Sequence, residues 1–236
     1  MIQGKKPALF RFREERLPTL WCKGCGNHIV LTSLLAALNK LKYDPEKTVI
    51  VSGIGCASRA SFYIDCDTVH TLHGRALPFA AGIKATRPDL SVIVIMGDGD
   101  AASIGGNHLI HAARRNLDVT TLCFNNLTYG MTGGQFSATT PITVKSRCTP
   151  TLSEKPFDLM KLVMAAGASY AARVTVSHTE RLILYLVNAL SNPGFSFVEA
   201  LASCPTHFGR HNNLDAPMDN IRWLETNFEP GEWRNP

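Results

Sequence analysis

Two short polar loops carry the residue types that bind magnesium and diphosphate. Gly97-Asp98-Gly99-Asp100 directly follows the apolar run VIVIM, and Asn125-Asn126-Leu127-Thr128-Tyr129-Gly130 follows the run VTTLCF, which places Asn126 28 residues after Asp98. Asp98 offers a carboxylate and Asn126 an amide oxygen, the hard ligands that Mg²⁺ takes together with phosphates. The glycines let main-chain N–H groups approach phosphate oxygens. The alternative is a tight Gly-Asp turn with an unrelated Asn-rich turn.

Four cysteines form a second group suited to chemistry. The chain has 7 cysteines, and this odd number with wide spacing argues against a disulfide scaffold. Cys22 and Cys25 share the segment WCKGCG, Cys56 follows GIG, and Cys204 precedes Pro205. Four thiolates suit a [4Fe–4S] cluster. Two alternatives are a structural zinc site, which also takes four thiolates, and a thioredoxin-like redox module, which has the WCxxC form.

The apolar pattern predicts the elements that position these loops. Near-continuous apolar runs indicate strands buried on both faces of a parallel sheet, at Thr48–Ser52, Thr68–Leu72, Ser91–Met96, Val119–Asn125, Ala171–Val176 and Phe195–Leu201. Helical spacing between them predicts helices at Asn27–Leu41, Gly74–Thr86, Gly105–Arg115, Pro156–Ala166, and from a capping box at Ser177 and Glu180 to about Leu190. This alternation predicts an α/β fold with a doubly wound, mostly parallel sheet, whose ligands bind at the carboxyl ends of the strands.

Length, composition and charge limit the number of domains and the classes of protein that the sequence can represent. With 236 residues and 45% apolar residues, we expect one α/β domain at 21–204, an N-terminal arm at 1–20 and an extended C-terminal tail at 205–236. The tail is either a surface extension or an arm laid on a partner subunit. No apolar run approaches the ~20 residues of a membrane span, no signal peptide is recognisable, and a net charge of +5 is too weak to indicate nucleic acid. We therefore expect a cytoplasmic protein with no membrane or nucleic-acid partner.

Taken together, the motifs resemble one enzyme family. GDG followed at this interval by NN is the thiamine diphosphate motif. With WCKGCGN, VSGIGC, HTLHGRALPFAAGIK and SCPTHFGR, the segment from about Trp21 to Arg210 resembles the β subunit of 2-oxoacid:ferredoxin oxidoreductases. It is most similar to the 2-oxoglutarate:ferredoxin oxidoreductase (2-oxoglutarate synthase) type. A dinucleotide-binding fold is the weaker alternative, because Gly53-x-Gly55-x-x-Ser58 lacks the third glycine of that motif.

The resemblance implies a role for each candidate residue. Cys22, Cys25, Cys56 and Cys204 would bind the [4Fe–4S] cluster, with Cys66 or Cys148 as alternatives for the fourth ligand. Asp98, Asn126 and the main-chain oxygen of Thr128 would bind Mg²⁺. The remaining residues expected to contact thiamine diphosphate are Gly55, Cys56, His73, Gly74, Arg75, Gly97, Gly99, Asp100 and Met131. Cys123 is expected to be a core thiol, and His207 to lie near the cluster.

The resemblance also implies a reaction and partners. It implies oxidative decarboxylation of a 2-oxoacid to an acyl-CoA and CO₂, with electrons passing through the cluster to ferredoxin, or the reverse reductive carboxylation. No glutamate occurs between Lys47 and Ser153, so we expect the glutamate that activates thiamine on an α subunit, in an (αβ)₂ heterotetramer. We expect 2-oxoglutarate as substrate, although some relatives have Lys where Gly133 stands. Pyruvate, other 2-oxoacids, or a non-redox thiamine decarboxylase with a structural metal site are the alternatives.

Overall fold

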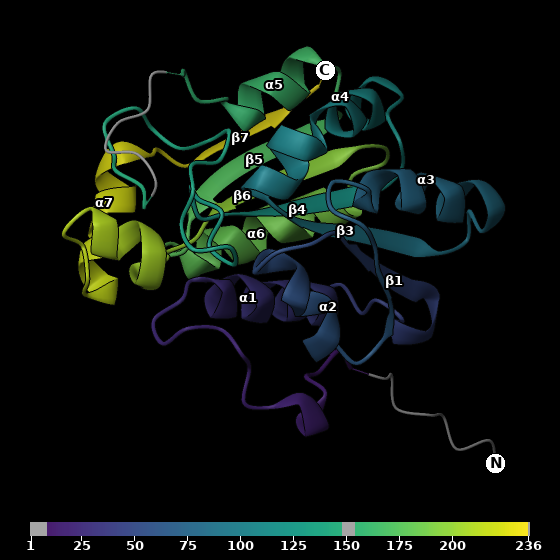
Figure 1. The fold of residues 1–236 in the computed structure, drawn as a ribbon. Coiled ribbons are helices and arrows are strands. Elements are labelled where there is room, and N and C mark those ends of the chain that lie inside the picture. The colour runs from purple at the N-terminus through teal and green to yellow at the C-terminus, as the bar shows by residue number, and fades with distance from the viewer. Residues whose placement is uncertain (1–8, 148–153, 236) are drawn as a thin grey trace.

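The computed structural model describes residues 9–147 and 154–235, which form a seven-stranded sheet covered by helices on both faces (Figure 1). The strands are β1 (Thr48–Ser52), β2 (Asp67–His70), β3 (Ser91–Gly97), β4 (Thr120–Asn125), β5 (Tyr170–Thr175), β6 (Ser196–Leu201) and β7 (Gly231–Arg234). The helices are α1 (Asn27–Lys40), α2 (Ala60–Tyr63), α3 (Ala76–Thr86), α4 (Gly106–Arg114), α5 (Leu159–Ala165), α6 (Thr179–Ser191) and α7 (Pro217–Asn227).

The sheet order is β2-β1-β3-β4-β6-β5-β7, and all neighbouring strands are parallel except β5 and β7. From β1 the chain crosses outward to β2, and it then returns past β1 to β3. The direction of winding therefore reverses between β1 and β3, the point at which doubly wound sheets bind ligands beyond the strand carboxyl ends. The predicted fold class and all six predicted strands are confirmed, with shifts of one or two residues at their ends.

Alternation along the strands builds a core on each face of the sheet. Ile93 and Ile95 of β3 pack with α1 and α6, whereas Val92, Val94 and Met96 of the same strand pack with α3, α4 and α5. This is the period of two expected when both faces of a strand are buried. Cys123 of β4 is buried in the second of these cores, as expected.

Four helix starts differ from the sequence prediction: α3 and α4 begin two residues and one residue late, at Ala76 and Gly106, and the shifts at α6 and α5 have a side-chain cause. The predicted capping box fails because the Ser177 hydroxyl contacts Thr175 Oγ1 (2.7 Å) and His178 Nδ1 (3.0 Å), and α6 begins at Thr179 with no side-chain cap. Helix α5 begins at Leu159, three residues after Pro156, because the Asp158 carboxylate accepts a hydrogen bond from Lys161 N and caps the helix there.

The C-terminal tail packs on the chain's own domain. Phe208 and Leu224 belong to a small core with Leu127, Val144 and Leu201, and β7 adds an antiparallel strand to the edge of β5. Contact of the tail with a partner subunit stays a prediction. None of the helices in 9–147 and 154–235 is long and apolar enough to cross a membrane.

Candidate active site at the carboxyl edge of the sheet

A cavity of about 90 Å³ lies at the switch point between β1 and β3. Its wall comes from the loops that follow β1, β2, β3 and β4, which meet there because parallel strands end on the same edge. It brings together most of the predicted cofactor-binding residues, namely Gly55, Cys56, His73, Gly97, Asp98, Gly99, Asp100, Asn126, Thr128 and Met131.

Asp98 places a buried carboxylate in this wall. Its Oδ2 accepts hydrogen bonds from the hydroxyls of Ser137 and Thr139, the latter at 2.8 Å. Burial raises the pKa of Asp98 to about 6, although both hydroxyls act in the opposite direction. Both hydroxyls donate to the same oxygen, so Oδ1 is the atom that this carboxylate can offer to a cation in the cavity.

The turn after β4 presents Asn126 beside Asp98. Asn126 Oδ1 accepts a 3.3 Å hydrogen bond from Thr128 N, and Leu127 between them has φ of 61°. Tyr129 reaches back across the cavity, so that a Cβ on Gly99 would overlap its ring. Glycine at position 99 is therefore required by the close approach of these two loops.

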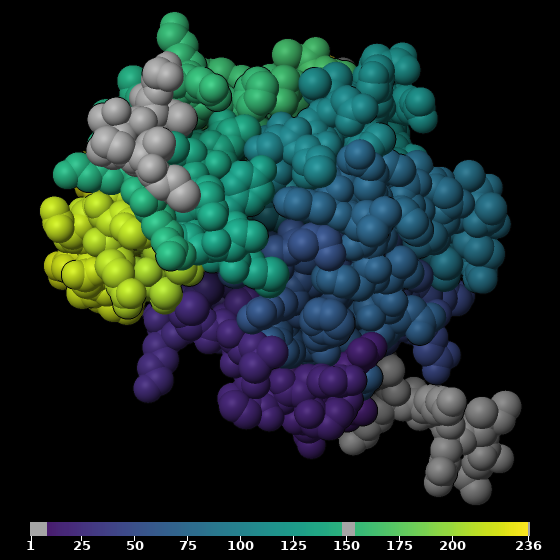
Figure 2. All heavy atoms as spheres, in the orientation of Figure 1, coloured from purple at the N-terminus to yellow at the C-terminus, as the bar shows by residue number. Residues whose placement is uncertain are grey.

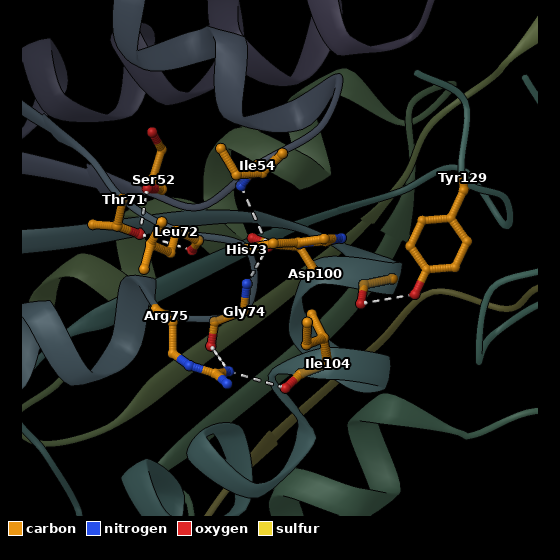
Figure 3. A network of polar contacts seen from close by, with 11 residues as sticks. Ser52, Ile54, Thr71, Leu72, His73, Gly74, Arg75, Asp100, Ile104 and Tyr129 are labelled. Atoms are coloured by element: carbon orange, nitrogen blue, oxygen red, sulfur yellow. Dashed lines mark hydrogen bonds and ion pairs between the residues drawn. The ribbon is translucent and has the colours of Figure 1, made fainter. Parts of the chain in front are cut away.

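Asp100 lines the cavity and also holds the surrounding loops together (Figure 3). Its Oδ1 accepts hydrogen bonds from His73 Nδ1, from Gly74 N at 2.6 Å and from Ile54 N at 3.3 Å. Its Oδ2 is buried and has no partner among the described residues. Burial raises the pKa of Asp100, against the effect of these donors.

Gly74 and Arg75 are the predicted contacts that do not line the cavity. Gly74 contributes its main-chain N–H to Asp100. The Arg75 guanidinium donates to the carbonyl oxygens of Gly74 (3.4 Å) and Ile104 (3.2 Å), so it braces the loop after β2 against the π-helical turn at Gly99–Ile104. His73 does line the cavity, edge-on to Tyr129 with ring centroids 6.1 Å apart.

The four predicted cluster cysteines line a second cavity, of about 180 Å³. Trp21 Nε1 donates to Cys56 O at 2.7 Å, which holds the Cys22 turn against the loop after β1. Gly26 N donates to Ser203 O at 2.9 Å, and Ser203 Oγ donates to Gly24 O at 3.1 Å. These contacts place the Cys25 turn beside Cys204. Cys22, Cys25, Cys56 and Cys204 are all free thiols.

The other cysteines lie elsewhere or outside the described part of the chain. The charged neighbours of Cys66 are Arg13, Asp67 and Asp65, with no other cysteine among them, and Cys66 does not line this cavity. Cys148 lies outside the described residues. His207 lines the cavity with the four thiols, in agreement with its expected position.

The four-thiol cavity is suited to an iron–sulfur cluster. Burial raises the pKa of Cys25 to about 12 and that of Cys56 to about 11, and the neighbouring thiolates add to both shifts. Such thiols ionise when a cationic metal group compensates their charge. Among the residues described, no three His, Cys, Asp or Glu side chains stand close enough to hold a single metal ion. A four-iron cluster instead takes one thiolate at each corner, so its ligands stand further apart.

The two cavities share a wall. Cys56, Asn126, Gly130 and Met131 line both of them. At Gly130 the thiols and the amide come together, because a Cβ there would lie 3.5 Å from Cys56 Sγ, 3.9 Å from Cys204 Sγ and 3.4 Å from Asn126 Nδ2. Two of the four thiols and the amide of the magnesium-type turn therefore meet at the wall that the two cavities share.

Sequence reasoning missed the residues that support the two loops. Ser137, Thr139 and Thr140 form a hydroxyl cluster behind Asp98 and the Asn126 turn. Its only sequence signal is the short hydroxyl-rich run SATT, which has no motif of its own. Glu199 was also missed. It is 2% exposed, accepts from Asn125 Nδ2 at 2.7 Å and pairs with Arg173.

The doubly wound sheet, with a Gly-Asp-Gly loop and an Asn-Asn turn at its switch point, defines a diphosphate-binding α/β domain. The family model for the thiamine pyrophosphate enzyme C-terminal TPP binding domain matches residues 53–200. The chain belongs to the β subunits of 2-oxoacid:ferredoxin oxidoreductases of the 2-oxoglutarate synthase type, and it is thus one subunit of an enzyme complex.

The relatives that show this family align over most of the chain. The chain is 49% identical to 2-oxoglutarate synthase subunit KorB of Methanothermobacter thermautotrophicus, over 96% of this chain and 80% of that protein. It is 40% identical to the β subunit of 2-oxoacid:ferredoxin oxidoreductase 2 of Aeropyrum pernix, over 87% and 64%. The 2-oxoglutarate:ferredoxin oxidoreductase of Magnetococcus marinus, solved with 2-oxoglutarate, coenzyme A and succinyl-CoA, matches with a TM-score of 0.84 and 35% identity, over 94% of this chain and 74% of that one.

Proposed function

We propose that this chain binds magnesium thiamine diphosphate and a [4Fe–4S] cluster side by side, and that with an α subunit it oxidises 2-oxoglutarate. The balanced reaction is 2-oxoacid + CoA + 2 oxidised ferredoxin → acyl-CoA + CO₂ + 2 reduced ferredoxin + H⁺. The carboxylate carbon leaves as CO₂, the thiol of CoA takes the acyl group, and two electrons leave singly. The reverse direction is reductive carboxylation.

The shared wall between the two cavities is the observation that carries this proposal. A thiamine decarboxylase without redox chemistry would have no use for four thiols next to its cofactor site. Here Cys56 and Cys204 lie against Gly130, whose other neighbour is the Asn126 amide of the magnesium-type turn. Electrons released at the first cavity would reach a cluster in the second across this shared wall.

The residues of the first cavity fit a magnesium diphosphate. Asp98, Asn126 and the main-chain oxygen of Thr128 would hold the ion, and the Gly97 and Gly99 main chain would line the diphosphate. Bound thiamine diphosphate supplies a nucleophilic carbon and an electron sink for the 2-oxo group. The chain's own contribution is to hold Asp98 with Ser137 and Thr139, to fix the Asn126 turn, and to place Met131 under the cofactor.

The residues of the second cavity fit the cluster, with Cys22, Cys25, Cys56 and Cys204 as its four thiolates. No glutamate lines the first cavity among the residues described, and Glu199 is held by Arg173 and Asn125 away from it. We therefore place the activating glutamate on the α subunit and expect an (αβ)₂ complex. The names of the relatives and the ligands of the solved neighbour support 2-oxoglutarate, CoA and ferredoxin as reactants.

The test is iron and acid-labile sulfide analysis of the αβ complex purified without oxygen, followed by assays with 2-oxoglutarate and with pyruvate. We expect about four irons and four sulfides per β chain and faster reduction of an artificial acceptor with 2-oxoglutarate. Cys22→Ser and Cys56→Ser should lose iron. The matched control Cys66→Ser, a half-buried thiol outside the cavity, should keep it. If the complex purified without oxygen contains zinc or no metal, the proposed electron transfer through a cluster is refuted. If pyruvate is turned over faster than 2-oxoglutarate, the proposed substrate is refuted.

A further inference from the structure

A buried ion pair lies in the sheet close to the magnesium-type turn that carries Asn126. Glu199 of β6 is in register with Cys123 of β4 and Arg173 of β5, so these three side chains share one face of the sheet. Cys123 belongs to the apolar core on that face. Arg173 Nε donates to Glu199 Oε2 at 2.7 Å. Because apolar side chains of similar volume often stabilise a core as well as a buried ion pair does, stability alone does not explain this pair.

The other oxygen of Glu199 fixes the orientation of the Asn125 side chain. Asn125 lies two residues beyond Cys123, so its side chain lies on the same face of β4. Its Nδ2 donates to Glu199 Oε1 at 2.7 Å. An ionised carboxylate only accepts hydrogen bonds, so the amide of Asn125 turns its NH₂ group toward Glu199 and its oxygen away. The ion pair therefore determines which way this amide points.

The oxygen of Asn125 in turn holds the magnesium-type turn. Asn125 Oδ1 accepts from Leu127 N at 2.9 Å, and Leu127 has a left-handed φ of 61°, which a bulky side chain rarely adopts. The same oxygen lies 3.1 Å from Thr139 Oγ1, the hydroxyl that also donates to Asp98 Oδ2. One amide oxygen thus contacts the supports of both predicted magnesium side chains, Asp98 and Asn126.

The segment that carries this turn has little regular structure of its own. Figure 2 shows the segment after β4 (teal) on the surface, beside the C-terminal segment (yellow). The described residues 126–147 form no helix. Such a segment depends on side-chain hydrogen bonds to keep one conformation. Glu199 and Asn125 supply two of these bonds from β6 and β4.

We infer that Glu199 is a positioning residue for the magnesium diphosphate. It orients the Asn125 amide, and this amide supports the Asn126 turn and the hydroxyl behind Asp98. Glu199 does not line the first cavity, so it acts through Asn125. The inference rests on the proposed function, since it requires the cofactor in that cavity.

A carboxylate is the group that satisfies both neighbours of position 199. Two donors face this side chain, Asn125 Nδ2 and Arg173 Nε, and they need two acceptors. Glutamine offers one acceptor and one donor group. If the glutamine oxygen stays on the Arg173 cation, its NH₂ group faces Asn125. The Asn125 amide must then lose this hydrogen bond or turn its own NH₂ group toward Leu127 N.

The test measures binding of thiamine diphosphate to the αβ complex by calorimetric titration at several Mg²⁺ concentrations. We expect Glu199→Gln to raise the Kd on the order of tenfold and to raise the Mg²⁺ concentration needed for half-maximal binding. Asn125→Asp alone should also weaken binding, because it places a second carboxylate beside Glu199. In the double variant the glutamine NH₂ group can donate to the new carboxylate, so most of the lost affinity should return.

Arg173→Met is the matched control for a purely structural effect. It removes the cation from the buried pair and lowers Tm, but it leaves Glu199 with one donor to satisfy. The Kd for thiamine diphosphate should therefore stay near that of the wild type. Iron content and elution from a sizing column, which should not change, verify that each variant complex is assembled. If Glu199→Gln does not assemble, the comparison of Asn125→Asp with the double variant decides, and the double variant must bind more tightly.

Three outcomes would overturn the inference. An unchanged Kd in Glu199→Gln means that this carboxylate does not position the cofactor. Equal losses of affinity in Glu199→Gln and Arg173→Met mean that the ion pair serves stability alone. Losses that simply add in the double variant mean that Glu199 does not act through Asn125. A wild-type complex that binds no thiamine diphosphate with Mg²⁺ is a separate result, which refutes the proposed function itself.

Discussion

The carboxylate of Asp100 and the imidazole of His73 form a hydrogen-bonded pair at the side of the first cavity, with Asp100 buried and His73 partly exposed. Asp100 lies in the turn that follows β3. Besides His73, the main-chain groups Ile54 N and Gly74 N donate to its carboxylate, and they belong to the loops after β1 and β2. One side chain thus joins three strand-end loops. Because Asp100 occupies Nδ1 of His73, Nε2 is the nitrogen left to face the cavity (Figure 3).

Asp100→Asn should loosen the contacts between these loops, while the volume of the side chain at position 100 stays nearly the same. The variant loses the charge that strengthens three hydrogen bonds to one oxygen, and bonds to charged groups contribute about 1.5–3 kcal/mol each. We expect the Kd for thiamine diphosphate of the αβ complex to rise at least tenfold, measured by calorimetric titration in the presence of Mg²⁺. Asp89→Asn, at an exposed carboxylate paired with Arg87, is the control. An unchanged Kd in Asp100→Asn would show that the clamp plays no part in cofactor binding.

Gly99→Ala tests the close approach of Tyr129 to the Gly-Asp-Gly loop. The added methyl would overlap the Tyr129 ring, and overpacking of this kind costs about 1–3 kcal/mol. We expect weaker binding of thiamine diphosphate, on the order of tenfold, and a lower Tm. Gly82→Ala in α3 is the matched control, because a Cβ there meets nothing within 4 Å. That variant should bind the cofactor normally and gain slightly in Tm, since alanine favours helix. Equal affinities in the two variants would contradict the prediction.

The strands and the two cofactor loops could be predicted from the sequence because their signals are local. A buried parallel strand is an unbroken apolar run, and the loop after it carries the polar residues. The role of Asp100 could not be predicted in this way. Its position in GDGD predicts a contact with the diphosphate, which stays a prediction. Its hydrogen-bond partners, Ile54, His73 and Gly74, could not be foreseen because they come from loops that only the sheet order brings together. Ser137 and Thr139 donate hydrogen bonds to Asp98 from about forty residues further along the chain, so their role could not be predicted from local sequence either.

Helix ends were predicted less well, because competing side chains decide them. At α5 a carboxylate cap at Asp158 displaced the start expected at Pro156. Helix α7 and strand β7 were missed, since a segment rich in Asn, Pro and charge gives little periodicity. Tertiary contacts order them: Leu224 is buried beside Phe208, and β7 takes its hydrogen bonds from β5.

Arg173 should be essential for stability. Its guanidinium is 17% exposed and donates to Glu199 Oε2 at 2.7 Å and to Asp158 Oδ1 at 2.6 Å. Arg173→Met leaves the buried Glu199 carboxylate without its cation, and removal of one partner from a buried pair costs about 3–5 kcal/mol. We expect a Tm lower by several degrees, measured by calorimetry. Arg222→Met, at an exposed pair with Asp219, should change Tm little. A similar small change in Arg173→Met would contradict this account.

Asp158 should contribute to the free energy of unfolding at neutral pH, and this contribution should be lost in acid. Burial alone would raise its pKa, but the hydrogen bond and charge of Arg173 outweigh burial and lower it. A carboxyl with a depressed pKa stabilises the fold fully above its unfolded value, about 3.9, and this contribution is lost as pH falls through the lower folded value. Denaturant titrations of Asp158→Asn from pH 7 to pH 3 should therefore show a flatter dependence on pH than the wild type. Parallel curves for the two proteins would contradict the assignment.

The short antiparallel strand β7 also determines how one side of the sheet meets other molecules (Figure 1). Without it, β5 would present unpaired main-chain N–H and carbonyl groups, a template on which another chain can extend a sheet. β7 covers that template with four residues that include Glu232 and Arg234, and Arg234 lies over the Tyr170 ring at 5.5 Å. A brief, charged, antiparallel strand offers little length for further pairing, so we expect β7 to limit the addition of other strands at this edge.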